Sequence, residues 1–219
     1  SDVCSSDLHL RAFRGKLDSD ADTDESWMHF EIDRTSDRTV LDQLERDLLR
    51  VLQDVRVAVE DEPKMRARAG EVAAAIKETA PPLPDKELAE GVELLDWLAD
   101  GHFTFLGYRD YTLTEGEDGE KRNELALRPE PGTGLGILRS DKRESDSFAA
   151  LPPEVREKAT EKRLLVITKA NSRSTVHRPL YLDYIGVKKF DESGAVIGER
   201  RFLGLFTHVA YSESIAHVP

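Results

Sequence analysis

Apolar residues in the first half of the chain follow the period of an α-helix. Between residues 36 and 62 they recur at steps of three and four, which places them on one helical face. Ser36 or Asp37 can cap the start of this helix, and Pro63 is expected to end it. The apolar positions are Leu41, Leu44, Leu48, Leu52, Val55 and Val59.

Two further helices are predicted before residue 101. The first ends before the proline-rich stretch 81–84, and the second begins at Asp85 as N-cap and stops before Gly101. Their apolar faces carry Met65, Ala69, Val72 and Ile76 in the first, and Leu88, Val92, Leu95 and Leu98 in the second. Residues 35–100 are therefore interpreted as a helical connector.

From His102 onward the apolar period changes to two, which is typical of strands. The predicted strands are residues 102–112, 123–128, 164–168, 181–190 and 195–207, with turns at Gly119 and Gly194 and a helix over 152–160. In the first strand Phe103, Phe105, Gly107, Arg109 and Tyr111 are expected on one side, and Thr104, Leu106, Tyr108 and Thr112 on the other. This pattern predicts an α+β module over 101–215, with a helix on an antiparallel sheet.

The first 34 residues have a different character. Residues 27–33 alternate between apolar and polar side chains, and they are interpreted as a strand that closes a truncated α+β module over 9–34. Residues 1–8 match, residue for residue, the translation of a common sequencing-adaptor stretch. They are expected to lie outside the fold, and Cys4, the one cysteine, lies among them.

Composition and charge narrow the possible functions. The chain carries 31 Lys and Arg against 43 Asp and Glu, a net charge of −12, which argues against nucleic-acid binding. No apolar run approaches the roughly 18–20 residues that span a bilayer, so a cytoplasmic protein without a membrane partner is expected. Residues 162–219 hold 9 basic and 5 acidic side chains, so they are mildly basic on an acidic chain.

The motifs for catalysis and cofactor binding are weak. The glycines of Gly132-Thr-Gly-Leu-Gly136 lack the G-x-G-x-x-G spacing that opens a nucleotide-binding helix, and they are expected to form a tight turn. The histidines are scattered without metal-ligand spacing. Ser174, His177 and Asp183 lie close in sequence, but a nucleophilic triad is defined by geometry. Catalytic, cofactor and metal sites are predicted to be absent.

One polar stretch remains as a candidate ligand or interface loop, directly after the strand 164–168. Its hydrogen-bond donors and positive charge suit a carboxylate or phosphate, although a polar surface loop or an interface segment between domains is the favoured interpretation. The candidate residues are Lys169, Asn171, Ser172, Arg173, Ser174, Thr175, His177 and Arg178.

Four blocks of sequence carry a family resemblance. They read ESWMHFEIDR (25–34), LADGHFTFLGY (98–108), LVITKANSRSTVHRP (165–179) and GERRFLGLF (198–206). In this order they resemble the N-terminal region of the large bacterial NAD-specific glutamate dehydrogenases. The resemblance implies ACT-like modules, small α+β units associated with amino-acid sensing and subunit contacts. Glutamate oxidation and the NAD site of the parent enzyme would then lie outside this fragment.

The leading hypothesis is therefore a non-catalytic regulatory and assembly fragment of such an enzyme. Its expected partners are the rest of the same polypeptide, further copies in a homo-oligomer, and an amino-acid effector. The alternative hypothesis is a stand-alone ACT-type amino-acid sensor. A third, weaker one is a hydrolase that uses Ser174 and His177.

Overall fold

In a computed structural model of the chain, the structure describes residues 29–115, 125–140 and 161–212. The chain divides into two compact units, residues 1–41 and 42–219, and all the described strands belong to the second. Three of the sequence-based predictions lie outside the described residues. They are the adaptor-like segment 1–8 with Cys4, the turn at Gly119 and the helix over 152–160.

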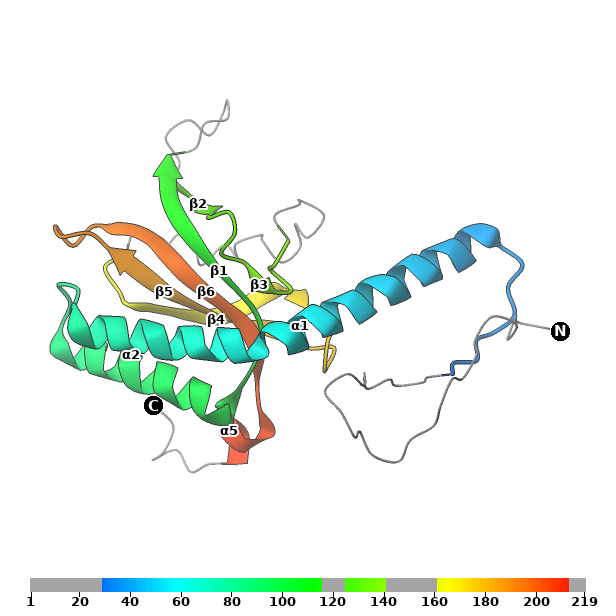
Figure 1. The fold of residues 1–219 in the computed structure, drawn as a ribbon, viewed down its shortest axis with the longest axis horizontal. Coiled ribbons are helices and arrows are strands. Elements are labelled where there is room, and N and C mark those ends of the chain that lie inside the picture. The colour runs from blue at the N-terminus through cyan, green and yellow to red at the C-terminus, as the bar shows by residue number, and fades with distance from the viewer. Residues whose placement is uncertain (1–28, 116–124, 141–160, 213–219) are drawn as a thin grey trace, which may run out of the picture. The chain divides into compact units, whose positions relative to one another are not determined.

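The described elements form an α+β fold with an antiparallel sheet, as the sequence predicted (Figure 1). The strands lie in the order β2-β1-β6-β5-β4, and β3 adds to β1. The helices are α1 (Arg38–Glu78), α2 (Asp85–Trp97) and α5 (His208–Ser212), with a π-type turn, η1 (Leu98–His102), after α2. The strands are β1 (Phe103–Glu115), β2 (Leu125–Pro129), β3 (Leu135–Gly136), β4 (Leu165–Arg173), β5 (Tyr181–Phe190) and β6 (Val196–Phe206).

The helices α1 and α2 pack against one face of this sheet (Figure 1). The apolar periodicity of residues 65–76 and 88–98 produces this contact, because the same side chains that recur at helical spacing meet the strands. Each large apolar side chain buried there contributes about 1.5–3 kcal/mol. The core contains Met65, Ala69, Val72, Ile76, Leu88, Leu95, Leu98, Phe103, Phe105, Tyr108, Ile185, Val187 and Phe202.

A second apolar cluster lies on the other face of the sheet. A β-bulge in β1 decides which side chains of that strand join it. The pairing of β1 with β6 shifts between Phe105 and Gly107. Tyr108 therefore lies with Phe103 and Phe105 in the first core, whereas Leu106 joins the second. The simple alternation predicted for this strand is wrong at that point, because a bulge inserts one residue and reverses which side chain faces which core.

Pro63 does not end a helix, contrary to the sequence prediction. Residues 38–78 form a single helix, α1, with Pro63 inside it. Proline removes one helical hydrogen bond, but Asp61 and Met65 on either side of it are both fully buried. Tertiary packing on both sides of the proline holds the helix together.

Pro63→Ala is expected to raise the free energy of unfolding by up to about 3 kcal/mol, because alanine restores a helical N–H and relieves the ring clash. Urea denaturation of the whole chain would measure this. Pro84→Ala is the matched control, since Pro84 precedes α2 and has no helical hydrogen bond to restore. A loss of stability in Pro63→Ala would contradict the prediction.

Two predictions for the N-terminal third are corrected. No strand forms over residues 29–33, the described part of the predicted strand 27–33, and Phe30 is 70% exposed. Alternation alone cannot make a strand without a neighbouring backbone to pair with. The apolar face predicted for the first helix is largely open as well, because Leu48, Leu52, Val55 and Val59 are all exposed.

The C-terminal hairpin follows the sequence prediction closely. β5 and β6 pair around a turn in which Gly194 has a φ of 78°. The carboxylate of Asp191 accepts the N–H groups of Ser193 and Ala195, each at 2.9 Å. β4 extends further than predicted, to Arg173, with an irregularity between Lys169 and Arg173 where it pairs with β5. The start of the candidate loop is therefore part of an edge strand.

Candidate functional site

The basic side chains of the candidate loop are held by neighbouring strands. Lys169 Nζ lies 2.5 Å from Asp183 Oδ1 of β5. Arg178 Nη2 donates to the Phe206 carbonyl at 2.7 Å. The Arg173 guanidinium lies over the Tyr181 ring, 5.1 Å from its centroid. Each of these cations therefore already has a contact within the sheet, and the Phe206 N–H, which donates to Asp183 Oδ2 at 3.3 Å, connects two of those contacts.

Ser174 has a structural role in this loop. Its hydroxyl donates to the Val176 carbonyl at 2.6 Å, and it accepts the Val176 N–H at 3.1 Å. Its own N–H donates to the Leu180 carbonyl. This local ring of hydrogen bonds shapes the turn. The hydroxyl is directed at the backbone, and Asp183 contacts Lys169, which argues against a Ser174–His177–Asp183 triad.

The remaining loop residues differ in their surroundings. Asn171 is exposed and Ser172 is half-buried. Thr175 Oγ1 donates to Asp54 Oδ2 of α1 at 3.1 Å, so the loop also contacts the helix. Burial raises the pKa of the Asp54 carboxyl, while the Thr175 hydrogen bond and Arg50 oppose that shift. His177 is exposed and has a φ of 68°, a left-handed conformation rare outside glycine.

Val176 and His177 line a cavity of about 470 Å³ between α1, β1 and the loop. The walls are mainly apolar, and Glu62 and His177 supply the ionisable groups. Its full lining is Val55, Ala58, Val59, Glu62, Pro63, Thr104, Phe105, Leu106, Val176 and His177. Of the eight candidate residues, only His177 lines this cavity.

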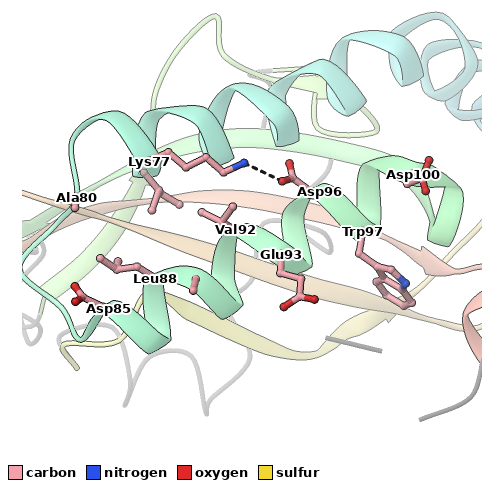
Figure 2. Close-up of a pocket in the computed structure, with 11 residues that line it drawn as sticks. Lys77, Ala80, Asp85, Leu88, Val92, Glu93, Asp96, Trp97 and Asp100 are labelled. Carbon is pink, nitrogen blue, oxygen red and sulfur yellow. Dashed lines mark hydrogen bonds and ion pairs between the residues drawn. The ribbon is translucent and has the colours of Figure 1, made fainter. Parts of the chain in front are cut away.

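A larger groove of about 860 Å³ runs between the end of α1 and the length of α2 (Figure 2). Its lining among the described residues is Ile76, Lys77, Ala80, Asp85, Leu88, Ala89, Val92, Glu93, Asp96, Trp97 and Asp100. Lys77 reaches across from α1 to Asp96 of α2 at 3.1 Å. The sequence analysis missed this groove. The one trace of it in the sequence is the three- and four-residue spacing of Glu93, Asp96 and Asp100, which places these carboxylates on one helical face. That spacing does not indicate a groove unless α1 is known to lie beside them.

Charged residues are also buried on the sheet face that the second apolar cluster covers. Arg201 is 1% exposed, and its guanidinium lies 3.7 Å from the centroid of the Tyr111 ring and 5.0 Å from that of Tyr184. Glu199, also 1% exposed, accepts a short hydrogen bond from the Tyr184 hydroxyl. Burial, above all, raises the pKa of Tyr184 well beyond its usual range. This arrangement of stacked rings around a buried cation stabilises the sheet.

Asp61 connects α1 to the turn around β3. Its carboxylate accepts Gly136 N–H at 2.9 Å, Arg139 Nε at 2.7 Å and Lys64 Nζ at 2.9 Å. The hydrogen bond from Arg139 is the main reason that the pKa of Asp61 lies far below its ordinary value. Gly136 itself has a φ of 59°, and Gly132 has a φ of 75°. The predicted tight turn at these glycines is confirmed.

Curated proteins match nearly the whole chain, and three of them carry the same name. The NAD-specific glutamate dehydrogenase of Halomonas elongata is 36% identical over 208 residues, and that of Pseudomonas aeruginosa is 38% identical over 200. The protein of the same name from Mycobacterium tuberculosis is 28% identical over 198 residues. Each alignment covers 89% of this chain. The chain belongs to the family of NAD-specific glutamate dehydrogenases.

The chain spans only 11–12% of the length of those relatives, so it corresponds to a fragment of such a dehydrogenase. No family model matches it. Three of the four blocks that carried the resemblance, 98–108, 165–179 and 198–206, lie mainly in β1, β4 and β6. β1 and β6 pair directly along nearly their whole length. These three blocks therefore lie in or beside the sheet.

Two further findings concern the part of the chain that the structure describes. No helix there is long and apolar enough to cross a bilayer. No group of three or more His, Cys, Asp or Glu side chains in those residues could hold a metal ion. His102 packs within the fold, its ring stacked on Trp97 at 4.4 Å and its Nδ1 lying 2.8 Å from the Trp97 carbonyl.

Proposed function

We propose that this chain is a non-catalytic regulatory and assembly segment of a large, cytoplasmic, homo-oligomeric NAD-dependent glutamate dehydrogenase. The parent enzyme would oxidise L-glutamate with NAD and water to 2-oxoglutarate, ammonium and NADH, at a site outside this segment. The observation that carries the proposal is the match of 89% of this chain to about one eighth of each relative.

One feature of the structure supports an assembly role. Exposed apolar side chains run along α1 at Leu48, Leu52 and Val55, and a row of such residues is typical of a surface that another element covers. The antiparallel sheet supports an ACT-like module over 101–215, and the helices that cover one of its faces come from the preceding helical segment 35–100.

One observation favours amino-acid sensing as a second candidate function. The cavity beside Val176 is large enough for an amino acid, and Glu62 and His177 are placed on a mainly apolar wall. A carboxylate for an ammonium group and an imidazole for a carboxylate, with apolar walls for a side chain, would suit such a ligand. This candidate function covers both an effector site within the parent enzyme and a stand-alone sensor.

Calorimetric titration of residues 9–219 with NAD, glutamate and a panel of amino acids would test these proposals. We expect no NAD binding and no oxidation of glutamate. Micromolar NAD binding would overturn the non-catalytic proposal. Binding of an amino acid that is lost in His177→Ala would support the sensing role. Binding that is lost only in Arg173→Ala with Arg178→Ala would place the ligand on the outer loop instead.

A further inference from the structure

The groove between α1 and α2 combines an apolar floor with an acidic rim. Ile76 and Leu88, both buried, line this groove. Val92 is half-buried between the helices (Figure 2). Four exposed carboxylates stand around this floor, on Asp85, Glu93, Asp96 and Asp100, against one ammonium, on Lys77. Lys77 pairs with Asp96, which leaves the rim strongly negative.

The stability of α2 does not account for this charge. The backbone carbonyls at a helix C-terminus carry partial negative charge, and acidic side chains there are unfavourable. Yet α2 has no basic residue in its last turn, and Asp96 and Asp100 lie at that end. Only Asp85 is at the end where a carboxylate helps the helix. Arg66 of α1 donates to the Ala99 carbonyl at 2.7 Å and Lys77 pairs with Asp96. A further cation from another molecule or segment would relieve the repulsion that remains at Asp100.

We propose that this groove is a docking site for a basic amphipathic helix, with apolar side chains on the floor and Lys or Arg along the rim. The groove lining runs from Asp85 to Asp100, about 22 Å at 1.5 Å per residue, which matches a partner helix of about 15 residues. A third helix seated there would pack its side chains between those of α1 and α2. The proposal goes beyond regulation and assembly, since it names the chemistry of the partner.

Charge complementarity argues against three other occupants. The same helical face of a second copy would bring one set of carboxylates against another, on chains of net charge −12. An anionic membrane or a nucleic acid would be repelled by the rim for the same reason. A helix rich in lysine or arginine is attracted by it.

Trp97 provides a direct readout, because it lines the groove and is half-buried. The probe is a synthetic 15-residue helix with leucines on one face and lysines beside them. In the full chain carrying Trp27→Phe, this peptide is expected to shift the Trp97 emission saturably. The affinity should fall at least about tenfold between low salt and 0.5 M salt, because salt screens exposed charges. A matched peptide with glutamate in place of each lysine should not bind.

Charge-reversal variants separate docking from general attraction to an acidic chain. Glu93→Lys with Asp100→Lys is expected to weaken peptide binding at least about tenfold. Glu71→Lys with Glu90→Lys makes the same change in net charge on α1 and α2 but outside the groove lining, and it should leave binding within about twofold. Thermal denaturation would verify that both variants fold. Equal losses in the two variants, binding of the glutamate peptide, or no saturable signal would each overturn the proposal.

Discussion

Arg201→Ala is expected to lower the free energy of unfolding by about 3–5 kcal/mol, a large part of the stability of a single domain. The guanidinium is fully buried between the Tyr111 and Tyr184 rings, and its Nε lies 3.2 Å from the Tyr184 hydroxyl and 3.5 Å from Glu199. Its removal leaves the Glu199 carboxylate buried without its cation and opens a cavity in the sheet. Urea denaturation of the whole chain would measure the loss.

Two variants test the cause of that loss. Arg200→Ala changes the same side chain at the next position of β6, where it is only half-buried, and should cost far less. Arg201→Met with Glu199→Leu removes both charges and should recover part of the stability, because a buried ion pair can be replaced by apolar side chains. If Arg201→Ala cost no more than Arg200→Ala, the proposed structural role of the cluster would be wrong.

Asp61→Asn is expected to cost about 2–3 kcal/mol at pH 7, since it removes the charge from hydrogen bonds to Gly136, Arg139 and Lys64. The carboxylate is fully buried, so water cannot replace these partners. Asp96→Asn is the control, because Asp96 is 53% exposed and its contact with Lys77 is a surface ion pair. That control should change the stability by less than about 1 kcal/mol.

The effect of Asp61 should also depend on pH. Its folded-state pKa lies below the ordinary value of 3.8, so its contribution is complete above that pH and is lost as the pH falls toward the folded pKa. The difference in the free energy of unfolding between wild type and Asp61→Asn should therefore shrink below pH 3.8, by about 1.4 kcal/mol per pH unit. Denaturation curves at pH 7, 4 and 3 would measure it. A difference that stayed constant from pH 7 to 3 would show that Asp61 does not titrate with a lowered pKa.

The local elements of this protein could be predicted from the sequence because short-range chemistry specifies them. The period of two after Gly101 indicated β1, and the turn residues at Gly194 indicated the hairpin of β5 and β6. The glycines at 132 and 136 indicated a tight turn. Each of these features depends on residues within a few positions, so the pattern alone was sufficient.

Tertiary packing decided the rest, because it brings together residues that lie far apart in the chain. The hydrogen bond from Thr175 to Asp54 joins residues 121 positions apart, and that from Gly136 to Asp61 joins residues 75 apart. The helix through Pro63 persists because packing outweighs one lost hydrogen bond. Arg200 and Arg201 are identical side chains at adjacent positions. Both faces of β6 are covered, so alternation along the strand cannot tell which of the two arginines is buried. The strands and segments packed on each face determine that it is Arg201.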